Sequence, residues 1–296
     1  MTGMEQTLTL IPDAAGWRVV RPADLPLGPL LLGRPVAEVA ALLPRLFSLC
    51  RTAQGMAARL CLGLPEPDGP QALAAEILRD HSLRLTVTLP PMLGLSPRAP
   101  TADPGLQLFG PARRLPDSPA AMMAWLAAGQ GAAPLVAAIA DAFAPREAAS
   151  TTLPLATPAN ALTGAVLENS AAARQSAHPL LQGIETTHGR GPLWRVLGML
   201  ADAEAAIAQR LPAPALQGTT AHVPAARGLY SLTLARTAGL VTRIHRITPT
   251  DHATAPQGAM ETALATLPQT KRHLAPLVAA LHDPCMGVTV KETRDA

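Results

Sequence analysis

Two short stretches near opposite ends of the chain carry the residues best suited to metal chemistry. Residues 45–54 read R-L-F-S-L-C-R-T-A-Q and contain Cys50, and residues 283–288 read D-P-C-M-G-V and contain Cys285. Thiolate sulfur is a preferred ligand of soft metal centres, so the two segments could contribute to one metal site. A free cysteine is also commonly a small buried hydrophobe, which is the competing interpretation for both.

The third cysteine, Cys61, has no motif partner and lies among leucines, which predicts a role in core packing. Three cysteines without a disulfide spacing pattern favour a reducing compartment. Residues 1–10 contain Glu5 and neither a basic start nor an apolar core, so we expect no signal peptide and a cytoplasmic location.

Other kinds of functional site find little support in the sequence. The motifs G-x-S-x-G, G-x-x-x-x-G-K-[ST] and H-E-x-x-H do not occur. Basic residues exceed acidic ones by three, but the arginines are scattered and aromatic residues make up only 2% of the chain. This pattern disfavours nucleic-acid binding, which requires clustered positive charge and stacking side chains.

The composition predicts a mainly α structure, because the 48% of hydrophobic residues are dominated by alanine rather than by β-branched or aromatic residues. Alternating patterns predict two β-hairpins, at residues 7–20 and 229–247. The uncharged residues 119–140 predict two packed helices around a turn rather than a membrane span, because glycines and Pro134 interrupt them.

Apolar periodicity places the helices. After a helix over 36–43, Pro44 cannot continue the hydrogen-bonding pattern without losing a bond, so we expect a break just before Cys50. Within residues 71–89, the spacings Glu76–Arg79 and Asp80–Arg84 predict surface ion pairs. The other predicted helices cover residues 52–62, 120–128, 132–144, 193–211, 258–267 and 269–281. Residues 90–119 hold eight prolines and should be irregular within a single domain spanning 1–296.

Together the two cysteine stretches resemble the paired motifs of the nickel–iron hydrogenase large subunit, R-x-C-x-x-C-x-x-x-H and D-P-C-x-x-C-x-x-H. In that family the first cysteine of each pair binds nickel, and the second bridges nickel to an iron that carries cyanide and carbon monoxide. This chain keeps Cys50 and Cys285 but has Phe47 and Val288 at the other two cysteine positions. The resemblance therefore implies a subunit-like protein with half of the sulfur ligands.

The other ligand positions of the family differ as well. Gln54 and Lys291 stand where the motifs have histidine, and Gly28 stands where the family carries a proton-transferring glutamate. Further segments nevertheless resemble the family in the same order along the chain. These are L-L-G-R-P at 31–35, E-x-x-x-D-H-x-x-R at 76–84, A-R-G-L at 226–229, I-T-P-T at 247–250 and the G-x-x-x-x-A-L of 258–264.

Shortened, ligand-poor relatives of the large subunit form the hydrogenase expression/formation accessory proteins of the HupK type, which this sequence resembles. The resemblance implies a mainly α fold with two small β-hairpins (α+β), like that of the large subunit but shortened in the middle. It implies no catalysis and no stable cofactor, but a transient iron–cyanide–carbonyl fragment held by Cys50 and Cys285. Arg227 would orient the cyanide ligands, and His252 is an additional candidate for metal contact.

Several alternatives remain open from the sequence. The chain could be a metal-free chaperone that binds or shields hydrogenase subunits, or a degenerate hydrogenase or complex I-type quinone-reacting subunit. Arg227 could form an ordinary structural ion pair, His81 could be an interior hydrogen-bonded residue, and His245 could be structural. The partners implied are a hydrogenase large or small subunit and other maturation proteins, with no nucleic acid and no membrane insertion.

Overall fold

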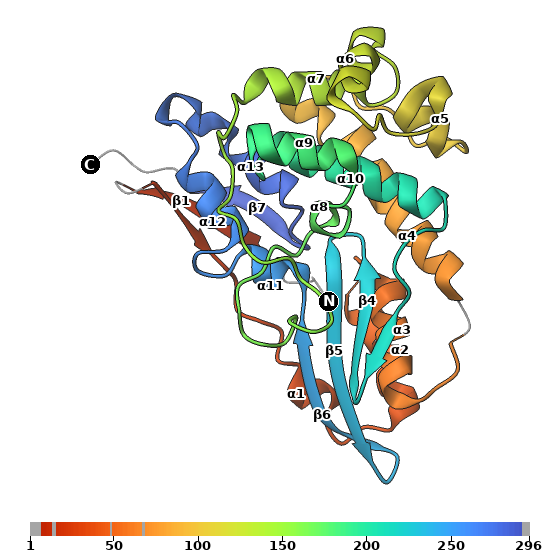
Figure 1. Cartoon of the computed structure of the whole chain (residues 1–296). Coiled ribbons are helices and arrows are strands. Elements are labelled where there is room, and N and C mark those ends of the chain that lie inside the picture. Colours follow the sequence, from red (N-terminus) through yellow and green to blue (C-terminus); the bar gives the residue numbers. More distant parts are fainter. Residues whose placement is uncertain (1–6, 14–15, 48, 67–68, 292–296) are drawn as a thin grey trace.

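The computed structural model describes residues 7–13, 16–47, 49–66 and 69–291. Figure 1 shows a layer of helices above a long antiparallel sheet, with a second, smaller sheet at one side. The mainly α, α+β architecture predicted from composition is therefore confirmed.

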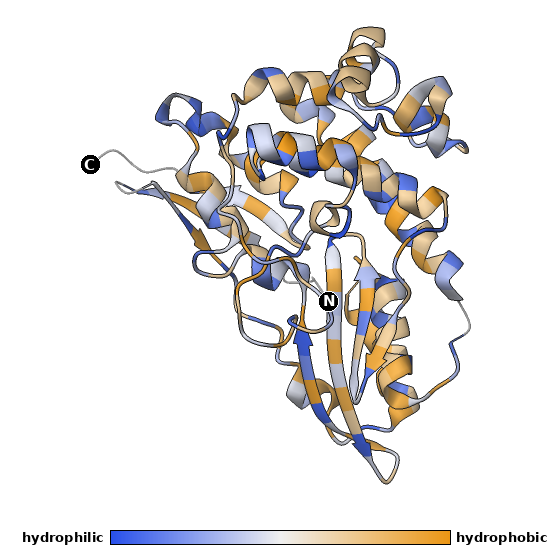
Figure 2. Cartoon of the chain, viewed as in Figure 1, coloured by the Kyte–Doolittle hydropathy of each residue, from blue (hydrophilic) through white to orange (hydrophobic). Residues whose placement is uncertain are grey.

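The larger sheet is an antiparallel meander in the order β3-β4-β5-β6. Its strands are β3 (Ala215–Gln217), β4 (Thr220–Ala225), β5 (Gly228–Thr237) and β6 (Leu240–Ile247). The predicted hairpin at 229–247 corresponds to β5 and β6, whereas β3 and β4 were not predicted. In Figure 2, β6 alternates between hydrophilic and hydrophobic residues, the pattern of a strand with one face toward solvent.

The smaller sheet joins the two ends of the chain. The predicted N-terminal hairpin is confirmed as β1 (Thr7–Asp13) paired with β2 (Gly16–Val20). A C-terminal strand, β7 (Gly287–Val290), adds to β1 in parallel, with Leu8 opposite Val288. Since β7 begins two residues after Cys285, this pairing fixes the second cysteine stretch beside the N-terminal part of the fold.

The helices before residue 90 form a group that packs on the larger sheet, with α3 against β4 and β5. They are α1 (Leu27–Leu31), α2 (Val36–Leu46), α3 (Arg51–Leu62) and α4 (Gly69–Leu83), followed by a π-helical turn over Arg84–Thr88. The predicted break just before Cys50 is confirmed, because α2 ends at Leu46, with Pro44 inside it, and α3 begins at Arg51. Pro44 lies so near the end of α2 that its lost hydrogen bond interrupts little of the helix.

The proline-rich segment 90–119 is less irregular than predicted. It contains 3-10 turns at Pro90–Leu93 and Gly110–Ala112 and a short helix, α5 (Pro104–Phe109). All three have a proline in the first two positions, where the missing N–H would have no partner in the helix anyway.

The remaining helices include α10, of which nearly every residue is buried and against which several of the others pack. They are α6 (Pro119–Ala128), α7 (Ala133–Ala142), α8 (Ala171–Arg174), α9 (Pro179–His188), α10 (Pro192–Ile207), α11 (Pro249–Ala253), α12 (Ala259–Ala265), a 3-10 stretch at Gln269–Leu274 and α13 (Ala275–Leu281). Gly198 lets α8 approach α10 closely, since an added Cβ would lie 2.2 Å from the Cβ of Ala172.

The uncharged segment forms two helices, as predicted. In the described part of the chain, no single helix is long and apolar enough to cross a membrane; α6 and α7 pass that test only as a pair, and they are bent by 111° relative to one another.

The apolar core has two parts. One gathers around α10 and includes α7, α9, α12 and α13 together with Leu8 and Leu10 of β1. The other lies between the helices α2, α3 and α4 and the strands β4, β5 and β6. The candidate site lies where elements of both parts meet, at the turn between β4 and β5.

Candidate functional site

Cys50 occupies an unusual backbone position immediately before α3. Its φ of 71° is left-handed, and its side chain does not cap the helix. The cap comes instead from Glu76 of α4, whose carboxylate accepts hydrogen bonds from the amides of Thr52 at 2.6 Å and Ala53 at 3.2 Å. Glu76 is thus a buried capping residue that fixes the start of α3, not the partner in a surface ion pair that its spacing to Arg79 predicted.

Arg227 lies in the turn between β4 and β5, and its neighbours hold that turn firmly. The side chain of Asn169 accepts from the amide of Leu229 at 2.6 Å and donates to its carbonyl at 3.0 Å. Arg174 donates to the carbonyls of Ala225 and Gly228, each at 3.0 Å. Gly228 has a φ of 142°, and an added Cβ would lie 2.4 Å from Asn169 Oδ1. The turn therefore requires glycine at this position.

The guanidinium of Arg227 joins three elements. Its Nη1 donates to Cys50 Sγ at 3.3 Å and lies 3.4 Å from Asp80 Oδ2 of α4. Its Nη2 lies 3.4 Å from Asp283 Oδ1, directly after α13. Arg84 pairs with the same carboxylate. Although burial opposes a charge here, the carboxylates of Asp283 and Asp80 raise the pKa of Arg227, which stays cationic.

Cys285 approaches the same guanidinium from the C-terminal side. It is exposed and lies two residues after Asp283, the carboxylate that pairs with Arg227. Thr250 of α11 fixes its position, because Thr250 Oγ1 donates to Cys285 Sγ at 3.1 Å and accepts from the Cys285 amide at 3.1 Å. The structure thus brings Cys50, Arg227 and Cys285 together, and we call these three residues the thiol–arginine site.

The two thiols differ in electrostatic environment. Burial raises the pKa of Cys50 to about 12; Arg227 opposes this rise, and Asp80 and Glu76 add to it. Cys50 is therefore a neutral thiol at ordinary pH. Because metals bind thiolate, a metal held by Cys50 would have to displace this proton.

Four side chains that sequence reasoning did not assign to the site hold it in place: Asp80, Arg84, Thr250 and Asp283. The sequence predicted that Asp80 and Arg84 pair with each other along α4, but Asp80 meets Arg227 and Arg84 meets Asp283. Although burial opposes ionisation, Arg227 and Arg84 lower the pKa of Asp283. The sequence could have indicated two of these four residues, because Asp283 and Thr250 lie within the D-P-C and I-T-P-T motifs.

The positions that lack metal ligands are occupied by residues with structural contacts. Phe47 lies under the guanidinium of Arg246, 4.1 Å from ring centroid to Cζ. Gln54 is buried and accepts a hydrogen bond from the Tyr230 hydroxyl at 3.0 Å. Val288 packs against the core from β7.

Lys291 is exposed just after β7, and its amide donates to the carbonyl of Leu10 at 2.9 Å. Each altered ligand position thus has a place in the fold that requires no metal.

The remaining candidate residues lie apart from these contacts. His81 is fully buried, and its Nε2 lies 2.8 Å from Asp202, so it is an interior hydrogen-bonded histidine. Cys61 donates to the carbonyl of Leu232 at 3.1 Å and helps α3 pack on β5. His245 is exposed on β6. Among the described residues, no group of three or more His, Cys, Asp or Glu side chains is arranged to hold a metal ion.

His252 is buried in α11, and its ring lies against the backbone of Ala161 and Ala165. Burial lowers its pKa, so the imidazole is neutral. A metal contact by His252 stays a prediction.

Comparison with known proteins gives a curated relative and likenesses among solved structures. The chain is 46% identical over 286 residues to the hydrogenase expression/formation protein HupK of Rhodobacter capsulatus, with 93% of this chain and 92% of that protein covered. An NAD+-reducing NiFe hydrogenase in the H2-reduced state has a similar fold, with a TM-score of 0.53, 16% identity and coverage of 91% of this chain and 92% of that chain. At that identity the likeness concerns the fold alone. No protein-family model matches the chain.

Proposed function

The chain belongs to the family of hydrogenase expression/formation proteins of the HupK type, and from that premise we propose that it is a non-catalytic accessory protein in the assembly of a nickel–iron hydrogenase. In this role it holds an iron–cyanide–carbonyl fragment as cargo before the fragment passes to the large subunit. The partners would be a hydrogenase large or small subunit and other maturation proteins.

The observation that carries the proposal is one buried guanidinium that joins the two cysteine segments from opposite ends of the chain. Arg227 donates to Cys50 at 3.3 Å and lies 3.4 Å from Asp283, two residues before Cys285. A guanidinium presents several N–H donors in a fixed fork, which suits the nitrogen end of a metal-bound cyanide. The sulfurs would bind the iron, and Arg227 would orient the ligands that the iron already carries.

The donor set suits a coordinated fragment better than a bare ion. No third ligand joins the two cysteines among the described residues. An iron that brings cyanide and carbon monoxide needs few protein ligands, whereas a bare tetrahedral ion in a structural site needs four. Two sulfurs would also hold the cargo weakly enough for transfer, and Cys50 would regain its proton when the iron leaves.

Infrared spectroscopy of the full chain tests this proposal. The protein is purified without oxygen after co-production with the other hydrogenase maturation proteins, and its iron content is measured alongside the spectrum. We expect cyanide and carbonyl bands that disappear in Cys50→Ser and Cys285→Ser and persist in Cys61→Ser, the matched control. A wild-type protein without such bands would contradict cargo binding.

A metal-free chaperone is the second candidate function. It is favoured by the structural contacts of Phe47, Gln54 and Val288, which give the altered ligand positions a purpose without metal. On this view the chain uses its large-subunit-like fold to bind or shield a hydrogenase subunit. The Cys50→Ser and Cys285→Ser variants would then still support hydrogenase activity in cells, whereas the cargo proposal expects that activity to be lost.

A further inference from the structure

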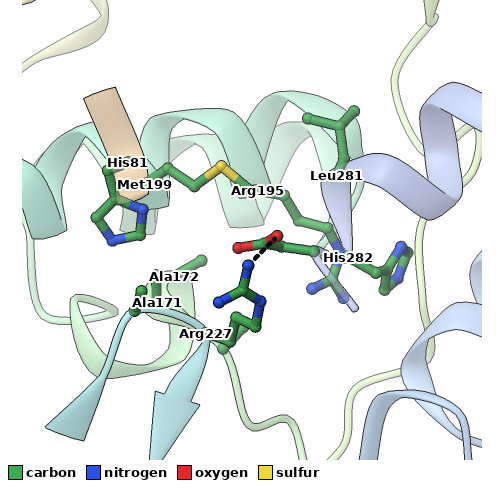
Figure 3. A pocket seen from close by; sticks show the side chains of 11 residues that line it. His81, Ala171, Ala172, Arg195, Met199, Arg227, Leu281 and His282 are labelled. Carbon is green, nitrogen blue, oxygen red and sulfur yellow. Dashed lines mark ion pairs between the residues drawn. The ribbon is translucent and has the colours of Figure 1, made fainter. Parts of the chain in front are cut away.

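A small internal cavity lies directly behind the thiol–arginine site. Its volume is about 10 Å³, and it is bounded by α8, α10, the end of α13 and the turn that carries Arg227. Figure 3 shows Arg195 and Arg227 reaching into it from different elements, with a dashed line for the ion pair between Arg227 and Asp283. Ala171 and Ala172 line it with small side chains, which leave the space open.

Two charged side chains that line the cavity each have a donor without a partner. Arg195 and Arg227 are more than nine-tenths buried, and the Nε of each lacks a hydrogen-bond partner among the described residues. Their terminal nitrogens are used elsewhere, Arg195 on Glu168 at 2.9 Å and Arg227 on Cys50 and its carboxylate partners. A buried N–H without an acceptor is costly, so both Nε groups require an acceptor from outside the described side chains.

The charges around the cavity are already balanced, which decides what kind of acceptor fits. The positive groups that line the cavity or contact its lining are four arginines, and each meets a carboxylate. The pairs are Arg84 with Asp283, Arg174 with Asp202, Arg195 with Glu168 and Arg227 with Asp80. An additional anion would leave one negative charge uncompensated in a buried place, so a neutral molecule is favoured.

The volume and the remaining polar groups identify that molecule. A cavity on the order of 10–15 Å³ holds a single water and is too small for a larger solute. Water accepts two hydrogen bonds and donates two. Acceptors for its protons lie in the same lining, in the carboxylate of Asp283 and in the unpartnered ring nitrogens of His81 and His282.

Each imidazole uses its other ring nitrogen elsewhere, so the unpartnered nitrogen is an acceptor when the ring is neutral. His81 Nε2 faces the Asp202 carboxylate, and His282 Nδ1 faces the Val278 carbonyl at 2.8 Å. Burial lowers the pKa of His282 to about 3, so that ring is neutral. Figure 3 places the two rings at opposite ends of the cavity, so one molecule meets at most one of them.

We infer that this cavity is a binding site for one permanently held water molecule, which accepts hydrogen bonds from Nε of both Arg195 and Arg227. The water ties the guanidinium of the thiol–arginine site to α10, the most buried helix of the fold. It therefore acts as a positioning group for Arg227, in addition to the contacts of this side chain with Cys50 and the carboxylates. The inference stands whether or not the thiols bind iron.

A high-resolution crystal structure of the wild-type chain grown with bromide tests it directly. We expect one light-atom peak within about 3 Å of both Nε atoms and no anomalous bromide signal in the cavity. A bromide peak there, or an absence of density with both Nε groups bonded to other protein atoms, would overturn the inference.

A solution experiment gives an independent answer through oxygen-17 relaxation dispersion of water, which counts long-lived internal molecules. The variant Ala171→Val adds two methyl groups to the lining, and Ala173→Val makes the same change on the same helix away from the lining. We expect the first to lose one long-lived water relative to the wild type and the second to lose none. Equal counts in the wild type and in folded Ala171→Val would refute the site.

Discussion

The two halves of the thiol–arginine site are built in opposite ways. Cys50 is partly buried, sits in a left-handed backbone conformation and is fixed by the Glu76 cap on α3. Cys285 is exposed and is oriented by the single hydroxyl of Thr250. Burial favours the neutral thiol at Cys50, whereas solvent reaches Cys285 freely.

This contrast shows how one shared charge can link two segments from opposite ends of the chain that are themselves held in different ways. Arg227 touches the buried half directly and is ion-paired to Asp283, two residues before the exposed thiol. One half is anchored by secondary structure and the other by a side-chain contact. Substitutions can therefore perturb each half separately, whereas a substitution of Arg227 should perturb both.

The largest effect should come from Arg227→Met, which breaks the link between the halves. The change takes the shared buried cation away from Asp80 and Asp283, although Asp283 keeps its pair with Arg84, so we expect a loss of about 3–5 kcal/mol in the free energy of unfolding. Urea denaturation measures it, with the exposed Arg243→Met as the matched control, which should change stability by less than about 0.5 kcal/mol. Similar stabilities for the two variants would contradict the bridging role.

The stability of Arg227→Met should also depend on pH differently from the stability of the wild type. Arg227 and Arg84 lower the pKa of Asp283 despite its burial, so the ionised carboxylate stabilises the fold above the ordinary carboxyl pKa and this contribution is lost as the pH falls. Without Arg227, the pKa of Asp283 is lowered less. The stability of Arg227→Met should therefore decline less steeply than that of the wild type between neutral and acidic pH, as measured by urea titrations at several pH values.

A smaller effect, confined to the buried half, is expected from Glu76→Gln. The amide cannot accept from both Thr52 and Ala53 as the carboxylate does, which should cost about 1–3 kcal/mol. The freed start of α3 should make Cys50 more reactive toward alkylating reagents while Cys285 is unchanged. Glu38→Gln, on the exposed face of α2, is the control. Equal gains in reactivity at both cysteines would mean that the halves are not independent.

The reactivities of the two thiols in the wild type compare the halves directly. Because alkylation requires accessible thiolate, Cys50 should react with iodoacetamide roughly tenfold or more slowly than Cys285 at neutral pH. The rate at Cys50 should then rise with pH toward its pKa of about 12. Mass spectrometry of the labelled peptides gives both rates from one sample. A faster reaction at Cys50 than at Cys285 would contradict the assignment of Cys50 to the buried half and Cys285 to the exposed half.

The smallest change should follow Thr250→Val, which preserves shape and removes the hydroxyl that orients Cys285. The loss of these two hydrogen bonds should destabilise the fold by about 1 kcal/mol. It should alter the alkylation rate of Cys285 and leave that of Cys50 unaffected. Thr250→Ser restores the hydroxyl and should return both quantities to wild-type values; a variant that still differs would point to packing by the methyl group instead.

Much of the secondary structure was accessible from local patterns. The helices around residues 52–62, 71–89 and 193–211 and both hairpins follow from periodicity and turn residues. The strands β3, β4 and β7 were missed because they are short, and β4 contains Pro224, which normally argues against a strand. Their stability comes from partners elsewhere in the chain, which no local window contains.

The site was predictable only in part, for the same reason. The convergence of Cys50, Arg227 and Cys285 followed from the ordered resemblance of motifs, not from any local signal. The partners Asp80 and Arg84 were assigned to each other because they lie four apart on α4, yet each pairs with a residue more than a hundred positions away. Helical spacing shows which side chains share a face, but it cannot show what packs against that face.

The parallel pairing of β1 with β7 has a consequence for when this site can exist. Leu8 and Val288 stand opposite each other although 280 positions separate them. Closing so long a loop costs chain entropy, and contacts between such distant segments are slow to form. The two cysteine segments therefore come together only once the chain has folded. A partner that binds both cysteines at once would distinguish folded chains from incompletely folded ones.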